Sequence, residues 1–243
     1  MYFTRHLEKI VNKMSRAFPV ILVTGPRQVG KTTFLKNIAD KNRAYVTLDN
    51  PLIRDLAKTD PELFLQRYQP PVLIDEIQYA PELLPYIKIQ IDEKKQKGDF
   101  WLTGSQMFHM MKNVTESLAG RAGVISMLGL STSEIFGLPN KPYETAFKQL
   151  ANQKPSLKNV NDVFERIYKG SMPALYETEQ DIEQYYASYV NTYLQRDIRD
   201  LTQVADELSF MRFMQACAAR TSRMVNFSEL AKDVGISSPT AKQ

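Results

Sequence analysis

The stretch that decides the fold is Val20-Ile-Leu-Val-Thr24 followed by Gly25-Pro-Arg-Gln-Val-Gly30-Lys31-Thr32. Its first part is an apolar run of strand length, which is typical of a strand buried on both faces of a parallel sheet. The second part matches the pattern G-x-x-x-x-G-K-[ST], which needs a strand before it and a helix after it. We therefore predict a phosphate-binding loop between a buried strand and a helix that begins at Lys31.

Each position of this loop has a role in holding the phosphates of a nucleotide. The two glycines let the backbone wrap so that successive amide groups point at the phosphates, at the positive end of the following helix. We expect Lys31 to reach the β and γ phosphates, Thr32 to bind a magnesium ion, and Thr33 to reach the α-phosphate side. With a nucleotide and Mg²⁺ as the expected ligands, the predicted nucleotide-binding residues are Gly25, Pro26, Arg27, Gln28, Val29, Gly30, Lys31, Thr32 and Thr33.

A pair of carboxylates follows a second apolar run, Val72 to Ile74, which ends directly before Asp75 and Glu76. Ligands collect at the carboxyl ends of the strands in open parallel sheets. Asp75 is therefore expected to hold magnesium together with Thr32, and Glu76 to orient or deprotonate the water that attacks the γ-phosphate. This pair favours hydrolysis, because the sequence carries no signature of a site for a second phosphoryl acceptor.

Three more residues are candidates for catalysis. A third apolar run, Phe100 to Thr103, is followed by Gly104 and Ser105. Thr103 or Ser105 would present a hydroxyl between the first two elements, where it could sense the γ-phosphate. Arg121 is either an arginine finger, which stabilises charge on the transferring phosphoryl group, or a surface arginine.

Apolar runs of strand length recur at 44–48, 72–74, 100–103 and 124–128, separated by stretches long enough for helices such as 5–17 and 83–95. This spacing predicts the α/β class, with a parallel sheet sandwiched by helices as in P-loop nucleotide-binding proteins. After Phe136 the chain becomes polar and rich in turn residues, and no apolar strand follows. We predict a P-loop ATPase domain at 1–137, a linker at 138–160, a helical region at 161–222 and the start of a helix-turn-helix at 223–243. A stripe of tyrosines within the predicted helix at 181–201 is expected to pack against a neighbouring helix.

The C-terminal residues 227–240 read as a short amphipathic helix, a turn at Gly235 and a capped second helix. Because the sequence stops at Gln243, the wing of a winged helix-turn-helix is expected to be missing from a truncated fragment. In DNA readers the second helix enters the major groove, and the contacts to suspect are Lys232, Thr240 and Lys242. A protein-interaction module or a purely structural one is the alternative.

Composition narrows the class of protein. The chain has 243 residues, 43% of them hydrophobic and 24% charged, which is the globular range. No apolar run reaches the length of a membrane span, and the N-terminus lacks the features of a signal peptide. The lone Cys217 cannot form an intrachain disulfide, so a cytoplasmic location is expected. The net charge of +4 permits nucleic acid as a partner, but no block of like charges points to it.

Several stretches together resemble the AAA+ superfamily of ATPases, in particular a prokaryotic group of ATP-binding proteins with an uncharacterised C-terminal domain. They are GPRQVGKTT at 25–33, LDNP at 48–51, VLIDEIQ at 72–78, WLTGSQ at 101–106, SLAGRAG at 117–123 and YLQRDIRDL at 193–201. The resemblance implies Lys31 and Thr32 as Walker A, Asp75 and Glu76 as Walker B, and Thr103 or Ser105 as the first sensor. No second sensor arginine is found after the core, so the mechanics of a ring-forming ATPase are not expected.

The predicted function is ATP binding with magnesium-dependent hydrolysis, used as a nucleotide-controlled switch on a macromolecular partner, for which DNA is one candidate. Two alternatives stay open. One is an adaptor that binds ATP and contacts proteins with negligible turnover, against which Glu76 argues. The other is a P-loop phosphotransferase, which would need a second substrate.

Overall fold

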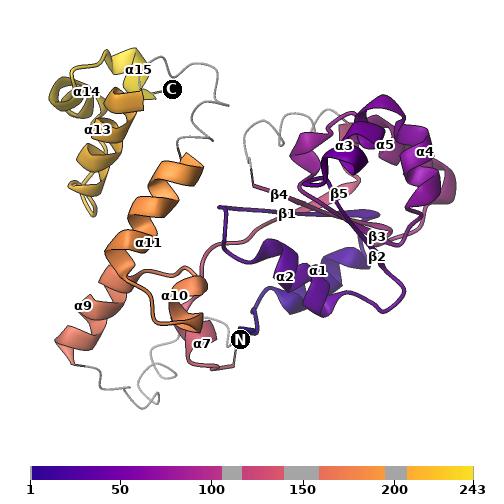
Figure 1. Ribbon diagram of the computed structural model, residues 1–243, viewed down its shortest axis with the longest axis horizontal. Helices are drawn as coiled ribbons and strands as arrows, with labels where there is room; N and C mark the ends of the chain where they lie inside the picture. The colour runs from indigo at the N-terminus through magenta and orange to yellow at the C-terminus, as the bar shows by residue number, and fades with distance from the viewer. Residues whose placement is uncertain (1, 106–116, 140–158, 195–206, 243) are drawn as a thin grey trace. The chain divides into compact units, whose positions relative to one another are not determined.

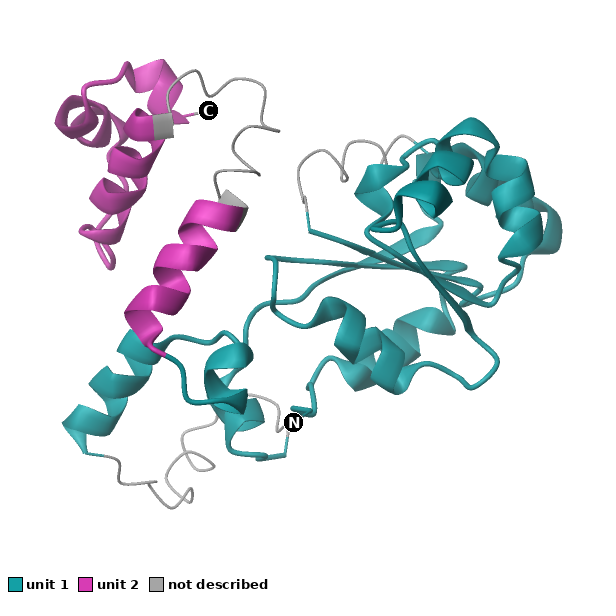
Figure 2. Ribbon diagram, in the orientation of Figure 1, with its two compact units in different colours: residues 1–180 teal, residues 181–243 magenta. Residues whose placement is uncertain are grey.

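The computed structural model describes residues 2–105, 117–139, 159–194 and 207–242. The chain divides into two compact units, residues 1–180 and 181–243 (Figure 2). The domain boundaries predicted from the sequence, at 137, 160 and 222, stay predictions. None of the helices in the described ranges is long and apolar enough to cross a bilayer.

The first unit is built on a five-stranded parallel sheet in the order β2-β3-β4-β1-β5 (Figure 1). The strands are β1 (Val20–Thr24), β2 (Ala44–Thr47), β3 (Val72–Asp75), β4 (Phe100–Gly104) and β5 (Ala122–Ser126). β1 and β4 are buried along their whole length, as a central strand covered on both faces must be. The α/β class and the parallel sheet predicted from the sequence are confirmed, and β4 lies between β1 and β3.

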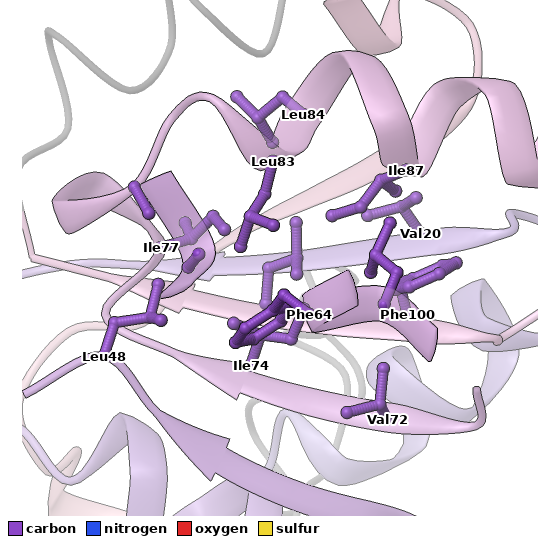
Figure 3. Close-up of a cluster of buried hydrophobic side chains, with 14 of the residues drawn as sticks. Val20, Leu48, Phe64, Val72, Ile74, Ile77, Leu83, Leu84, Ile87 and Phe100 are labelled. Carbon is purple, nitrogen blue, oxygen red and sulfur yellow. The ribbon is translucent and has the colours of Figure 1, made fainter. Parts of the chain in front are cut away.

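Helices cover both faces of this sheet (Figure 1). One face packs against α1 (Glu8–Ser15) and α2 (Lys31–Ile38) through a cluster that includes Val11, Ile21, Phe34 and Trp101. The other face packs against α3 (Pro51–Thr59), α4 (Pro61–Arg67) and α5 (Leu83–Lys94). Figure 3 shows the second cluster, in which side chains of α4 and α5 lie on those of β1, β3 and β4. Alternate residues of β1, β3 and β4 contribute to the two clusters, because successive side chains point to opposite faces.

Among the elements predicted in the first unit, two begin more than one residue away from their predicted starts. β5 begins at Ala122, two residues before the predicted run at 124–128. It pairs with β1, and its exposed positions alternate with buried ones, so the apolar run does not mark its ends. α1 begins at Glu8, although the apolar spacing predicted a helix from Arg5. Arg5 instead donates hydrogen bonds from a buried position before the helix.

Beyond the sheet, the described part of the first unit contains further short helices. These are α7 (Thr132–Ile135), α9 (Val160–Lys169) and α10 (Ala174–Glu177). α7 begins with a capping box, in which the Ser131 hydroxyl accepts from the backbone of Glu134 and the Glu134 carboxylate accepts from the backbone of Ser131. Most of the predicted linker, 140–158, lies outside the described residues.

The second unit is helical in its described part. It contains α11 (Ile182–Tyr189), a π-helical turn (Val190–Leu194), α13 (Glu207–Ala218), α14 (Phe227–Val234) and α15 (Ser238–Lys242). The last two helices are joined through Gly235, whose φ of 78° gives the left-handed cap that a side chain would disfavour. The helix-turn-helix predicted from the sequence for this helix pair stays a prediction. Residues 207–242 contain no strand, so a wing is not confirmed.

Candidate functional site

The loop between β1 and α2 wraps tightly at the carboxyl edge of the sheet. Gly25 has a φ of 143°, and a Cβ at this position would lie 2.0 Å from the carbonyl oxygen of Met127. Gly30 has a φ of 89° at the start of α2, and Gln28 between them has a φ of 61°. Left-handed residues in such a run turn backbone amides toward one concave side, which makes an anion-binding nest.

Lys31 lies at the start of α2 and is buried, with 5% of its surface exposed. Its ammonium donates to the carbonyl oxygens of Gly25 and Pro26, at 3.0 and 2.7 Å. The Lys31 side chain therefore folds back over the phosphate loop that precedes it in the sequence. A cation in this position, with the helix N-terminus beside it, suits a phosphate group. Thr33, two residues further along the same helix, is exposed.

Asp75, at the end of β3, is the centre of a cluster of hydroxyl groups. Its Oδ1 accepts from Thr32 at 2.6 Å and from Thr103 at 2.5 Å. Its Oδ2 accepts from the Tyr45 hydroxyl at 3.3 Å. The structure thus brings together three residues predicted for the site, from α2, β3 and β4.

Tyr45 is a member of this cluster that sequence reasoning missed. Burial, and next the negative charge of Asp75, raise the pKa of its phenol to about 12, so it stays a hydrogen-bond donor. The Lys36 ammonium lies 3.3 Å from the centre of its ring. Tyr45 stands on β2, which pairs with β3 so that Thr47 is opposite Asp75. Tyr45 reaches the site only through the pairing of β2 with β3, and no local sequence motif predicts its place there.

Glu76 follows Asp75 in a left-handed conformation, with φ 59° and ψ 49°. Its backbone N–H donates to the Thr103 hydroxyl at 3.0 Å. Its carboxylate accepts from the Gln78 amide and from the Ser105 hydroxyl, the latter at 3.3 Å. Gln78 also donates to the Ser105 hydroxyl at 3.1 Å, so hydrogen bonds link the side chains of Glu76, Gln78 and Ser105 to one another. A left-handed non-glycine residue is uncommon, and such residues cluster at functional sites.

Arg121 is not brought to this site. It precedes β5 and therefore lies at the amino edge of the parallel sheet, opposite the phosphate loop. Its guanidinium pairs with the carboxylate of Asp92 at 2.7 and 3.0 Å. The hydrogen bonds from Arg121 lower the pKa of Asp92. Within its own chain Arg121 is a surface ion-pair residue.

The oxygen atoms at Asp75 and Thr32 fit a magnesium ion. Mg²⁺ prefers hard oxygen ligands and is usually bound by one or two carboxylates together with substrate phosphates and water. The carboxylate and the hydroxyl already lie 2.6 Å apart at the foot of the loop. The described residues hold no group of three or more acidic, histidine or cysteine side chains that would make a metal cage by itself. This donor set suits a metal that arrives with a nucleotide.

Comparison with known proteins agrees with this geometry. A family model for an AAA domain matches residues 17–136, and a second, described as a domain of unknown function (DUF8612), matches residues 160–243. The uncharacterized proteins Rv2008c of Mycobacterium tuberculosis and Mb2031c of Mycobacterium bovis are each 26% identical to the chain over 231 residues. The match covers 93% of this chain and 46% of each relative, so the chain spans about half the length of these curated relatives.

Among solved structures, the Walker-type ATPase paby2304 of Pyrococcus abyssi superposes with a TM-score of 0.54 at 14% identity, covering 96% of this chain and 89% of that one. At this identity the likeness concerns the fold alone. The fold, the phosphate loop and the family match agree. The family model for an AAA domain therefore matches the part of the chain, residues 17–136, that carries the parallel sheet and the phosphate loop, and the fold is that of P-loop nucleotide-binding proteins.

Proposed function

We propose that this chain binds ATP with Mg²⁺ and hydrolyses it, and that the nucleotide state acts as a switch on a macromolecular partner. The observation that carries the proposal is the hydrogen bond of 2.6 Å between Thr32 and Asp75. It joins the helix that starts at the phosphate loop to the strand end that bears the two carboxylates. The cation, the hydroxyl and the acid needed for phosphate chemistry thereby meet at one edge of the sheet.

Phosphate binding is assigned to the loop 25–33. Its backbone amides and the N-terminus of α2 would hold the β-phosphate, with Lys31 reaching the β and γ phosphates. In the structure the Lys31 ammonium bonds to two carbonyl oxygens of the loop. An arriving phosphate would exchange these neutral acceptors for charged ones, which are stronger partners for an ammonium.

Magnesium would be held by the Thr32 hydroxyl and by Asp75, directly or through water. When bound, it neutralises charge on the β and γ phosphates. The Thr103 and Tyr45 hydroxyls would keep the Asp75 carboxylate oriented, since each donates to one of its oxygens. Such outer hydrogen bonds orient a ligand and tune its affinity for a metal.

Glu76 is assigned as the residue that orients or deprotonates the attacking water. Gln78 and Ser105 hold its carboxylate, and its backbone is fixed by Thr103. Thr103 is fully buried and uses its one hydroxyl hydrogen on Asp75, so we assign it a positioning role. Ser105 is the better candidate to sense the γ-phosphate, because its hydroxyl hydrogen can turn from Glu76 to a phosphate oxygen. No step is assigned to Arg121.

Oxygen tracing distinguishes hydrolysis from its two rivals. ATP and Mg²⁺ are incubated with the chain in ¹⁸O-labelled water, and the released phosphate is analysed by mass. We expect one solvent oxygen in each phosphate, because water attacks the γ-phosphorus. Loss of ATP without free phosphate would favour a phosphotransferase. Tight ATP binding without loss of ATP would favour the nucleotide-gated adaptor.

The second part of the proposal concerns the macromolecular partner. The helix pair α14 and α15 has the turn at Gly235 that a helix-turn-helix needs, and Lys232, Thr240 and Lys242 are exposed on it. We propose duplex DNA as the partner to test first. Binding should weaken as salt rises, because lysine contacts with phosphates release counterions. Lys232→Ala combined with Lys242→Ala should reduce both the affinity for DNA and its salt dependence. An affinity that changes neither with salt nor with the two substitutions would refute DNA recognition by this helix pair.

A further inference from the structure

The buried Arg5 guanidinium connects the phosphate loop to the segment after β5. It donates to the Val29 carbonyl at 3.0 Å, and to the carbonyls of Leu128 and Gly129 at 2.6 and 3.1 Å. It also pairs with the Glu134 carboxylate, at 3.1 Å. We propose that Arg5 is a positioning residue that holds the phosphate loop in its nucleotide-binding conformation. This inference rests on the proposed function, because it concerns the affinity of that same loop.

The bond to Val29 acts on the part of the loop that faces the phosphates. Val29 stands between Gln28 and Gly30, both of which are left-handed. In a trans peptide the carbonyl and the following N–H point in opposite directions within one plane. Fixing the Val29 carbonyl therefore fixes the direction of the Gly30 N–H. That amide is one of the donors that a wrapped loop turns toward a phosphate.

Without Arg5 the Val29 carbonyl would lose its charged partner. Val29 is buried, with 1% of its surface exposed. A buried carbonyl without a donor costs free energy, so the peptide would be drawn to turn toward another partner. Such a turn would move the Gly30 N–H away from the direction that binds phosphate. The expected effect is on the nucleotide-binding conformation of the loop, besides any loss of stability.

Arg5 is itself held in place by an ionised partner. Both side chains of the Arg5 and Glu134 pair are 5% exposed. The Glu134 carboxylate also accepts from the backbone N–H groups of His6 and Ser131, each at 2.8 Å. Burial would raise the pKa of Glu134, but these N–H groups and the Arg5 guanidinium outweigh it and lower the pKa. The carboxylate thus stays charged and fixes the guanidinium against the loop.

The chain offers a matched control in Arg43, at the opposite edge of the sheet. Arg43 is also a largely buried arginine that donates to two backbone carbonyls, those of Gly98 and Asp99, and pairs with a carboxylate, that of Asp40. It precedes β2, at the amino ends of the strands, so it cannot contact the phosphate loop. Replacing either arginine with lysine keeps the charge and removes the planar set of donors.

The test measures the Kd of ADP, and KM and kcat for ATP, on the full chain and on Arg5→Lys, Arg5→Met and Arg43→Lys. Thermal unfolding is followed on the same samples. We expect Arg5→Lys to raise the Kd of ADP about tenfold, because one charge-assisted hydrogen bond to the loop is lost. KM should rise with it while kcat changes less. Arg43→Lys should lower the melting temperature and leave the Kd unchanged.

The outcomes distinguish failure of the Arg5 role from failure of the proposed function. An unchanged ADP Kd in folded Arg5→Lys, or an equal rise in Arg43→Lys, would refute the positioning role of Arg5. Arg5→Lys decides the question if Arg5→Met fails to fold. A wild-type chain that binds neither ADP nor ATP would overturn the proposed function itself, and the role of Arg5 with it.

Discussion

The Thr32 hydroxyl donates a hydrogen bond of 2.6 Å to Asp75 Oδ1, across 43 positions of sequence. The two residues come from α2 and β3, and β4 lies between β3 and β1 in the sheet. Thr103 of β4 donates to the same oxygen at 2.5 Å. The carboxylate thus receives one hydroxyl group from α2 and one from β4, so the side chain that would hold a phosphate-bound metal is already oriented beside Thr32.

Asp75→Asn should remove the effect of magnesium on nucleotide affinity. The amide keeps an oxygen for the Thr32 and Thr103 hydroxyls but loses the negative charge that attracts the metal. We expect Mg²⁺ to lower the Kd of ATP in the wild type. The factor by which it lowers the Kd should be at least about tenfold smaller in the variant. Binding is measured with and without Mg²⁺. Asp92→Asn, at the amino edge of the sheet, is the control and should behave as the wild type; an unimpaired magnesium effect in Asp75→Asn would contradict the metal assignment.

Lys31→Ala should weaken binding of ADP and ATP alike. The ammonium is buried beside the loop, and loss of a buried charged partner costs about 2–5 kcal/mol, which is roughly a thirtyfold or larger rise in Kd. Titration calorimetry with each nucleotide gives the Kd directly. Lys41→Ala removes an exposed ammonium and should leave both values unchanged. Similar affinities in Lys31→Ala and Lys41→Ala would remove Lys31 from the site.

Gly25→Ala should be much more destabilising than Gly120→Ala. Both glycines have positive φ, so both alanines are strained. A Cβ at position 25 would also meet the Met127 carbonyl oxygen at 2.0 Å, whereas a Cβ at position 120 would meet nothing within 4 Å. Strain alone costs about 1–2 kcal/mol. Thermal unfolding of both variants measures the difference, and equal losses would show that the loop does not press against the segment that follows β5.

Glu134→Gln should remove part of the pH dependence of stability. The pKa of Glu134 lies below its ordinary value of 4.5 in the folded chain. The stabilisation from its ionised form is therefore fully present above that value and is lost as the pH falls through the folded pKa. The difference in free energy of unfolding between wild type and variant should shrink from about pH 6 to about pH 3.5. Urea unfolding at several pH values tests this, and a constant difference would contradict it.

The sequence was informative where structure is local. The phosphate loop could be placed because the strand, the glycines and Lys31 are contiguous. The third apolar run predicts a hydroxyl between the loop and Asp75, from Thr103 or Ser105, and Thr103 is the one that donates to Asp75. Tyr45 and Arg5 could not be predicted as parts of the site. Tyr45 reaches Asp75 only through the pairing of β2 with β3, and Arg5 reaches Val29 from before α1. Apolar spacing also extended that helix over Arg5, since periodicity does not reveal a buried polar contact.

The ends of helices and strands show the same limit. The predicted strand at 124–128 lies two residues too late, because an edge strand is buried at alternate positions and its apolar letters do not mark its ends. Within the described part of the helix predicted at 181–201, α11 gives way to a π-helical turn that ends at Leu194. Tyr185 and Tyr189 stack on each other within α11, with ring centres 6.4 Å apart. Packing of the tyrosine stripe against a neighbouring helix stays a prediction.

ATP hydrolysis at this site is tested most directly by measuring phosphate release from ATP and Mg²⁺ by the wild type and by Glu76→Gln, with ATP affinity measured on the same samples. We predict equal ATP affinity in both proteins and turnover in the wild type alone, because the substituted amide would keep the shape of the side chain and lose its basicity. The same turnover in both proteins would contradict the assignment of Glu76, and absence of ATP binding in both would contradict the nucleotide site.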